Sequence, residues 1–425
     1  MKRALSFAFL HLLLLNTVHA ADTGAGAGYF FREHWYQPGA TNGNPDYEIN
    51  KRFRVNAPEA VLHPTFGSRR EVRASGMMTV YAEEDLRLLT GAELYLELWG
   101  GHPHSANKRV TINGRNTYSI PEIGTASGHC THQYPIIPLK LNELVNGYNA
   151  LQFAVDQGKS FWGHFIVEQA AIKATLTNNH PALNPAGLAD FSARVEAATD
   201  GELTTLKLVS NGAARIASVE FHGHYHGYDE NGDGRMDDWH GFTKARAPVA
   251  IIGSATNAPF QTAWDMTMLP AQSDMQVRAV VRFREPSGLS YVTPPTRGLR
   301  TPERPQARVA LYSARNIPPQ FWSRAGRKVM TDIHVEDDPA DIISAELHVV
   351  VWDGGAGKVK EYFTLNDHPF PVAGGGKHDT IYSRLRVDPK ILKRGANQIV
   401  VHSDTEHHGI EVLLPGPALV VRSRR

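Results

Sequence analysis

The segment from residue 229 to 239 reads DENGDGRMDDW and carries oxygen ligands at regular intervals. With Asp229 as position 1, oxygen-bearing side chains follow at positions 3, 5 and 9, and a glycine stands at position 6, where a loop must turn sharply. A hard cation such as calcium takes about six to eight oxygen ligands, backbone carbonyls included. The spacing therefore predicts a structural calcium site formed by Asp229, Asn231, Asp233, the Arg235 carbonyl, Asp237 and Asp238.

This spacing resembles the EF-hand calcium loop through its ninth position. It departs from that loop at position 12, where His240 replaces the bidentate glutamate. Asp238 or a residue outside the segment would then have to complete the ligand shell. The alternative interpretation is an acidic turn of Asp, Asn and Gly residues that binds no ion.

Three histidines, His222, His224 and His226, alternate with other residues just before that segment. A β-strand would place their rings on one face, about 6–7 Å apart. Together with His240 they could bind zinc or copper, or His224 could act as a general acid or base toward a sugar. We favour a solvated strand face beside a sugar-binding groove, because no metallohydrolase motif accompanies them.

Histidine and aromatic residues also gather in segments that would form loops at the ends of strands. Pyranose rings stack their C–H faces on aromatic side chains, and their hydroxyl groups need hydrogen-bonding partners. The predicted substrate-binding residues are Trp162, His164, His102, His104, His378 and Glu406. Trp99 and Trp352 end apolar strands, so the core is their expected place.

The segment from residue 402 to 417, HSDTEHHGIEVLLPGP, has the density of polar groups that a catalytic site needs. The candidate catalytic residues are His407, His408 and Glu411, in addition to His224. A glycosidase would use two carboxyl groups at a fixed separation. A lyase would use a base and a cation that neutralises a uronate. Tyr382 and Arg384 are candidates for those two roles, although an exposed strand explains them equally well.

Apolar residues alternate with polar ones in nearly every segment, as in residues 94–98 (LYLEL) and 277–283 (VRAVVRF). This period of two is typical of half-buried strands, and Gly, Pro, Asn and Asp interrupt it at short intervals. The helical-looking stretch from Glu83 to Leu89 is short enough for a single turn. The sequence therefore predicts an all-β chain.

An internal repeat divides the chain. AELYLELW (residues 92–99) matches AELHVVVW (345–352), and fourteen positions beyond each tryptophan stand Asn113 and Asn366. LVNGYNALQF (144–153) then matches LKRGANQIVV (392–401), each with a Gly-x-Asn turn before an apolar strand. These anchors keep one order, which predicts two copies of one sandwich.

The repeated anchors resemble galactose-binding-like jelly rolls over residues 29–177 and 307–424. The segment 188–300 is similar to a bacterial Ig-like domain in its VEF, APF and AWD strands, with the acidic loop as an insertion. Residues 178–187 and 301–306 read as linkers, because they are rich in residues that cannot extend a sheet. These resemblances imply a multidomain β-sandwich, in the order jelly roll, Ig-like sandwich, jelly roll, and leave the function open.

Residues 1–20 have the basic start, apolar core and Val-His-Ala ending of a cleaved secretory signal peptide. We therefore expect an exported protein, periplasmic or extracellular. Cys130 is the single cysteine, so no internal disulfide can form, and we expect it to be buried. The 44 basic and 43 acidic residues give a net charge of +1, which favours no nucleic acid or membrane partner.

Taken together, these features favour a carbohydrate-binding or scaffold protein that engages an extracellular polysaccharide through jelly-roll loops. Two sandwiches of one kind raise avidity without new chemistry. The alternatives are a secreted polysaccharide hydrolase or lyase and a cell-surface structural protein. No feature indicates the oligomeric state.

Overall fold

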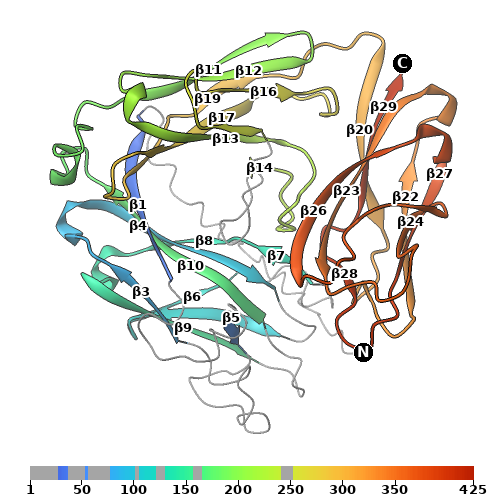
Figure 1. Cartoon of the computed structure of the whole chain (residues 1–425), viewed down its shortest axis with the longest axis horizontal. Helices are drawn as coiled ribbons and strands as arrows, with labels where there is room; N and C mark the ends of the chain where they lie inside the picture. The colour runs from blue at the N-terminus through green and yellow to red at the C-terminus, as the bar shows by residue number, and fades with distance from the viewer. Residues whose placement is uncertain are drawn as a thin grey trace, which may run out of the picture.

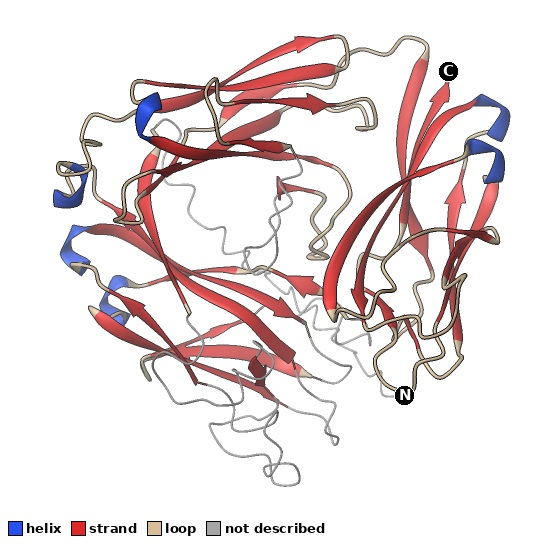
Figure 2. Ribbon diagram, viewed as in Figure 1, coloured by secondary structure: helices blue, strands red, loops and turns tan. Residues whose placement is uncertain are grey.

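The computed structural model describes residues 27–36, 53–55, 77–100, 105–120, 130–156, 165–240 and 252–425. Antiparallel strands form nearly all the regular structure, and the helices within these ranges are 3₁₀ turns of three residues (Figure 2). The predicted all-β class of packed sandwiches is therefore confirmed. The stretch from Glu83 to Leu89 holds one such turn, Leu86–Leu88, as the sequence predicted.

Two facing sheets form the first sandwich, which ends at residue 176 (Figure 1). One sheet contains β1 (Tyr29–Trp35), β2 (Phe53–Val55), β4 (Leu89–Trp99), β7 (His132–Gln133), β8 (Ile136–Leu139) and β10 (Phe165–Leu176). The other contains β3 (Met77–Ala82), β5 (Ala106–Ile112), β6 (Asn116–Ser119) and β9 (Gly147–Asp156). Leu94, Leu96, Val110 and Phe153 are fully buried between the sheets. The leucines that alternate in residues 94–98 are therefore the side chains that β4 turns into the core.

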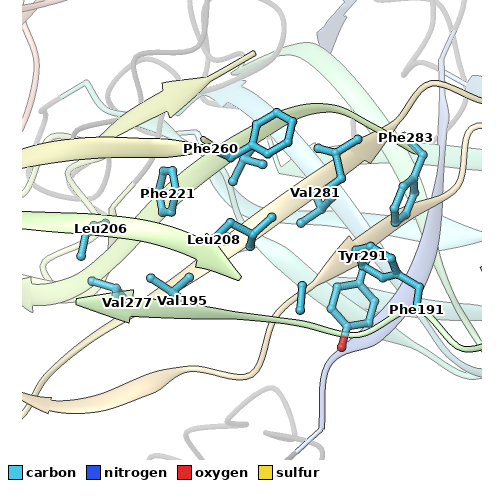
Figure 3. Close-up of a cluster of buried hydrophobic side chains, with 14 of the residues drawn as sticks. Phe191, Val195, Leu206, Leu208, Phe221, Phe260, Val277, Val281, Phe283 and Tyr291 are labelled. Atoms are coloured by element: carbon cyan, nitrogen blue, oxygen red, sulfur yellow. The ribbon is translucent and has the colours of Figure 1, made fainter. Parts of the chain in front are cut away.

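The middle sandwich has a three-stranded sheet on one side and a wider sheet on the other. The narrow sheet contains β11 (Ala193–Asp200), β12 (Leu203–Ser210) and β16 (Gln261–Asp265). The wider sheet contains β13 (Ile216–His226), β14 (Asp237–His240), β15 (Gly253–Ala255), β17 (Met275–Phe283), β18 (Ser290–Val292) and β19 (Thr296–Leu299). Figure 3 shows Leu206 and Leu208 of the narrow sheet close to Phe221 and Val277 of the wide one, in one buried cluster.

Ten strands from residue 307 onward form the third sandwich. They are β20 (Ala307–Arg315), β21 (Trp322–Ser323), β22 (Lys328–Val335), β23 (Ile342–Asp353), β24 (Phe363–Leu365), β25 (His368–Pro369), β26 (Asp379–Val387), β27 (Gly395–His402), β28 (Ile410–Val412) and β29 (Ala418–Arg424). β20 pairs with both β29 and β22 and so joins the two layers. Leu347, Val349 and Ile399 are fully buried between them.

The segments that repeat in the sequence make the same hydrogen bonds in both outer sandwiches. Asn113 Nδ2 donates to Asn149 Oδ1 at 2.9 Å, and Asn366 Nδ2 donates to Asn397 Oδ1 at 2.8 Å. The first asparagine of each pair adopts a positive φ, 50° and 49°, and the second bonds the backbone four residues earlier in both copies. The repeat therefore preserves a buried amide pair that pins a loop to the late strand.

Strand β1 belongs to two sandwiches at once. Tyr29 to Phe31 pair with β18 of the middle sandwich, and Phe31 to Trp35 pair with β10 of the first (Figure 1). One sheet thus continues from the first sandwich into the middle one. Phe30 extends this link into the middle core, where its ring lies 5.0 Å from that of Tyr291. The first two sandwiches are consequently joined by backbone hydrogen bonds and a shared core.

The segments predicted to be linkers are packed against the sandwiches. Leu183, within residues 178–187, is 1% exposed and belongs to the middle core. In the segment 301–306, Arg304 forms an ion pair with Glu202 and donates to the Leu269 carbonyl at 2.9 Å. Both segments therefore have fixed positions.

The third sandwich contacts both of the others through the turn that precedes β29. The Leu414 amide donates to the Cys130 carbonyl at 3.0 Å, and the Tyr228 hydroxyl donates to the Gly416 carbonyl at 2.6 Å. Around these bonds Trp99, Cys130, Tyr228, Val350, Leu413 and Ala418 form a buried cluster from all three sandwiches. Cys130 is buried, as predicted, and burial raises the pKa of its thiol well above the ordinary value.

No helix in the described ranges is long and apolar enough to cross a membrane. The predicted signal peptide, residues 1–20, lies outside those ranges.

We predict that Asn397→Ala destabilises the third sandwich. The side chain is fully buried, and its loss leaves the Lys393 amide and carbonyl without it and removes one of the two hydrogen bonds that Asn366 Nδ2 donates. We expect a loss of about 2–3 kcal/mol in the free energy of unfolding, seen as a melting temperature several degrees lower. Asn257→Ala, at an exposed turn, is the control and should leave the melting temperature unchanged. A third sandwich equally stable in both variants would show that the repeated amide pair is dispensable.

Candidate functional site

A cavity of about 220 Å³ lies between the middle and third sandwiches. The middle sandwich contributes β13, β14, β16 and the turn after it, and the third contributes β20, β23, β26 and β29. Its aromatic and polar wall is formed by Tyr225, Tyr228, His240, Trp264 and Asp265 from the middle sandwich and by Glu346, His348, Tyr382 and Arg384 from the third. Aromatic rings and hydrogen-bonding groups therefore line it together.

A second hollow is less suited to an organic ligand. It has a volume of about 490 Å³ and is lined by residues 271–273, 300–305, 307–309 and Arg425, without an aromatic side chain among them. Two of its arginines are engaged, Arg304 with Glu202 and Arg308 with Asp337. We therefore take the smaller, aromatic cavity as the candidate site.

The strand pattern explains why polar side chains of the third sandwich reach this cavity. In β23 the odd positions from Leu347 to Val351 fill the core, so Glu346 and His348 lie on the opposite face. Register pairs His348 with Arg384, which places their side chains on the same face of neighbouring strands. Period two thus builds a row of polar groups outside an apolar core.

These groups form a connected chain of contacts. The Tyr382 hydroxyl and His348 Nδ1 are 2.8 Å apart, and His348 Nε2 lies 3.4 Å from Glu346 Oε2. The Arg384 guanidinium holds both oxygens of Glu346, at 2.7 and 3.1 Å. If the tyrosine donates, the imidazole is neutral and turns its Nε2–H toward the carboxylate.

The pKa shifts agree with that assignment. Burial lowers the pKa of His348, and its contact with Glu346 offsets this only in part. Burial alone would raise the pKa of Glu346, but the contacts from His348 and Arg384 outweigh this effect and lower the pKa to about 2. Burial raises the pKa of Tyr382 well above its ordinary value. At neutral pH the row therefore holds a protonated tyrosine, a neutral histidine and one closed ion pair.

The middle sandwich supplies the aromatic wall. The Tyr228 ring stacks on that of Tyr382, with centroids 5.8 Å apart, and the Tyr225 ring stacks on that of His240 at 4.1 Å. His240 Nδ1 lies 3.1 Å from Glu230 Oε2. Burial lowers the pKa of His240, but the hydrogen bond to Glu230 outweighs it and raises the pKa to about 9. His240 is therefore protonated at neutral pH, and the neighbouring Glu230 carboxylate balances its charge.

The structure brings the two predicted lyase residues, Tyr382 and Arg384, to the same cavity, but in states that do not suit a lyase. Arg384 is already held by both oxygens of Glu346. Tyr382 has a raised pKa, so it favours its protonated form over the phenolate that a base requires. The geometry fits hydrogen bonding to a ligand better than proton abstraction.

Two residues predicted in the loops of the third sandwich are brought together. His378 Nε2 and His408 Nδ1 are 2.9 Å apart, and the Trp352 ring meets both rings edge-on. His407 and Glu406 are exposed in the same loop. Trp352 is half-buried at this point, whereas Trp99 is buried as expected.

Glu411 does not join those loops. It lies on β28 with its side chain buried against Cys130 and Trp99, at the junction with the first sandwich. Burial raises the pKa of Glu411 to about 7. Glu411 is thus buried, whereas the loop carboxylate of Glu406 is exposed, so the two differ in their access to a substrate.

The three alternating histidines do share one face of β13, as predicted. His222 and His224 are half-buried and His226 is exposed, while the residues between them are buried. His240 pairs with Gly223 in the register, so it points to the opposite face. His240 therefore lies on the other face from the three histidines and does not join them. Within the described ranges no three His, Cys, Asp or Glu side chains come together to hold a metal by themselves, so an ion would need amide or carbonyl oxygens as well.

Four of the predicted calcium ligands, Asp229, Asn231, Asp233 and Arg235, lie in the turn between β13 and β14, and Asp237 and Asp238 begin β14 itself. Asp229 is buried, Asn231, Asp233 and Asp238 are half-buried, and Arg235 and Asp237 are exposed. The Gly234 amide donates to Asp229 Oδ2 at 2.9 Å, so the chain closes around that carboxylate. Burial and the neighbouring Asp233 raise the pKa of Asp229 to about 7, and burial raises that of Asp238 to about 6.

Four predicted substrate-binding residues, His102, His104, Trp162 and His164, lie outside the described ranges. The cavity residues Glu346, His348 and Tyr228 were not identified from the sequence. The signal for the first two was present in AELHVVVW, where polar residues occupy alternate positions of an otherwise apolar strand. That pattern predicts which side chains lie on the outer face of the strand, but it does not predict which part of the protein packs against that face.

No family model matches the chain, and no curated protein matches it. Among solved structures it is similar to a β-porphyranase of glycoside hydrolase family 86 from the human gut bacterium Bacteroides plebeius, with 12% identity and a TM-score of 0.23 over 55% of this chain and 37% of that one. It is also similar to a β-glucuronidase from an uncultured Clostridium, with 8% identity and a TM-score of 0.20 over 71% and 49%. A third similar structure is the β-glucuronidase of Ruminococcus gnavus, with 10% identity and a TM-score of 0.19 over 67% of this chain and 45% of that one.

The chain thus spans from about a third to a half of the length of these solved structures. Likeness at such TM-scores carries no argument about function. The candidate site stands on its own geometry.

We predict that His348 makes the stability of the protein fall with acidification. Its pKa is lowered in the folded state, so below about pH 6.5 the unfolded chain binds more protons and stability drops as the pH falls. Glu346, with a pKa of about 2, stays charged over this range. The melting temperature of His348→Gln should therefore fall less than that of the wild type between about pH 7.5 and about pH 5.

His334→Gln, at an exposed position of β22, is the matched control and should keep the wild-type slope. An identical slope in His348→Gln and the wild type would contradict a buried, neutral His348.

Proposed function

We propose that this chain is an exported glycan-binding protein whose binding site is the cavity between the middle and third sandwiches. The observation that carries the proposal is the composition of its wall. The rings of Tyr225, Tyr228 and Trp264 line it together with the hydrogen-bonding groups of the third sandwich. Sugars present apolar C–H faces and hydroxyl groups, and this wall offers partners to both.

The size of the cavity limits the ligand. Sites for drug-sized ligands have volumes of roughly 300–1,000 Å³. A cavity of about 220 Å³ is smaller, so it accommodates one sugar ring or the end of a chain. A site enclosed between two sandwiches suits the terminal sugar of a glycan, whereas binding along the middle of a polymer would need an open groove.

The charges favour an uncharged or amino sugar over a uronate. Arg384 is neutralised by Glu346, and His240 by Glu230. Asp265 is the exposed acidic residue in the wall and has no ion pair within the described residues. An anionic ligand would meet this carboxylate without an unpaired cation nearby.

The loop surface around His378, His408 and Trp352 is the alternative place for a glycan, as the sequence predicted. Its support is the edge-on contact of Trp352 with both imidazoles beside exposed polar residues. We keep hydrolase or lyase activity and a purely structural role as the rival functions, which the experiment below separates.

We further propose that the protein acts in the periplasm or outside the cell, after cleavage at residue 20. The outer sandwiches are proposed as galactose-binding-like jelly rolls and the middle one as an Ig-like domain. The sequence anchors described above are the support for these assignments.

We predict that one neutral or amino oligosaccharide from a panel binds the mature protein in calorimetry and raises its melting temperature. Asp265→Asn, an exposed change that spares the fold, should weaken this binding at least about tenfold, the loss of one charge-assisted hydrogen bond. Arg384→Met keeps the side-chain stem but removes the guanidinium, and it should weaken binding as well.

Glu406→Gln and His378→Ala are the controls in the loop surface and should bind as the wild type does. The opposite pattern, with loss in these two variants alone, would move the site to the loops. New reducing ends or the ultraviolet absorbance of unsaturated ends would show that the protein is an enzyme. A panel without any binding would contradict the glycan-binding function.

A further inference from the structure

We propose that the turn between β13 and β14 binds a calcium ion, and that this ion holds the middle sandwich against the third. We name this turn, residues 227–236, the acidic turn. In Figure 1 the chain between β13 and β14 runs toward β26 and β28 of the third sandwich. The ion site does not depend on glycan recognition.

One buried oxygen in the acidic turn has no partner. Asp229 is 3% exposed, and its Oδ1 atom is buried without a hydrogen bond, whereas Oδ2 accepts from the Gly234 amide inside the turn. A buried carboxylate oxygen without a partner is unfavourable, because its lost hydration is not replaced. A cation inside the turn would supply the missing partner.

The surrounding groups fit a hard cation. Asn231 and Asp233 turn their side-chain oxygens back onto the turn, where they accept from the amides of Asp233 and Arg235. The side-chain nitrogen Asn231 Nδ2 donates to Asp238 Oδ2 at 3.4 Å. No ion pair within the described residues engages Asp229, Asp233 or Asp238, while Glu230 is taken by His240. Oxygen donors of this kind, carboxylate, amide and backbone carbonyl, suit calcium, and imidazole or thiolate ligands are not offered.

The same turn carries the contact with the third sandwich. The Tyr228 hydroxyl, one residue before Asp229, donates to the Gly416 carbonyl at 2.6 Å. Gly232 has a φ of +64°, and a Cβ there would lie 2.2 Å from the Leu414 carbonyl oxygen, so backbone packs directly on backbone. The proposed ligands Asp229 and Asp233 therefore each follow directly after a residue that contacts the turn 413–418, Tyr228 and Gly232 respectively.

This alternation couples ion binding to docking. An ion that fixes Asp229 and Asp233 also fixes Gly232 between them and Tyr228 before them. Without the ion, repulsion among the carboxylates opposes the closed turn and with it the contact. Because Tyr228 lines the cavity, the ion would set the width of the candidate site as well.

We predict that calcium binds the metal-stripped mature protein in calorimetry and raises its melting temperature by several degrees, whereas magnesium has little effect. Hydrogen exchange should slow in two peptides at once, the acidic turn and residues 413–418. Asp229→Asn should lower the calcium affinity at least about tenfold. In chelator this variant should be at least as stable as the wild type, because one repelling charge is gone, and this result shows that it folds.

Asp388→Asn is the matched control, because Asp388 also accepts a backbone amide in an exposed turn but lies far from the acidic turn in sequence. It should bind calcium as the wild type does. The absence of any calcium effect on heat, melting temperature or exchange would overturn the ion site. Slower exchange in the acidic turn alone would overturn the coupling to the third sandwich. Neither result depends on a glycan, so both are separable from a failure of the proposed function.

Discussion

The turn from Leu413 to Ala418 is the contact on which the arrangement of the sandwiches depends. It bonds to the first sandwich through the Cys130 carbonyl and to the middle one through the Tyr228 hydroxyl. β1 has already joined those two sandwiches into one sheet, and the third adds to this contact the Arg422–Glu202 ion pair and the Tyr228–Tyr382 ring stack with the middle sandwich. The buried Glu411 and the docked acidic turn lie at this junction.

The chemistry of the cavity reflects the demands of burial. Each charged side chain that lines the cavity, apart from the exposed Asp265, is matched by a neighbour, as in Glu346 with Arg384 and His240 with Glu230. Such pairing lowers the cost of desolvation, but it also removes the free acid, base or cation that catalysis would require. Hydrogen bonding and ring stacking remain, and these are the interactions of recognition.

Much of the fold could be predicted from the sequence, because strand alternation and turn chemistry are local. The asparagines at 113 and 366 identified the repeat, since a positive φ and a buried amide pair constrain one position strongly. The site could not be predicted in the same way. Alternation in residues 345–352 shows that His348 leaves the core, but the neighbour that it meets lies more than a hundred residues away, at Tyr228. The positions of Glu411, against the first sandwich, and of His240, on the face of β13 opposite the three histidines, could not be predicted for the same reason. Strand register and the docking of the sandwiches decide which face of a strand meets a neighbour.

Small-angle X-ray scattering of the mature protein in calcium tests the central claim most directly, because it reports how the three sandwiches are arranged in solution. The account predicts a profile that fits one compact body, with the third sandwich seated against the other two. A longer maximum dimension, with a profile that requires a third sandwich moving freely about residues 301–306, would contradict it and would remove the cavity as a site.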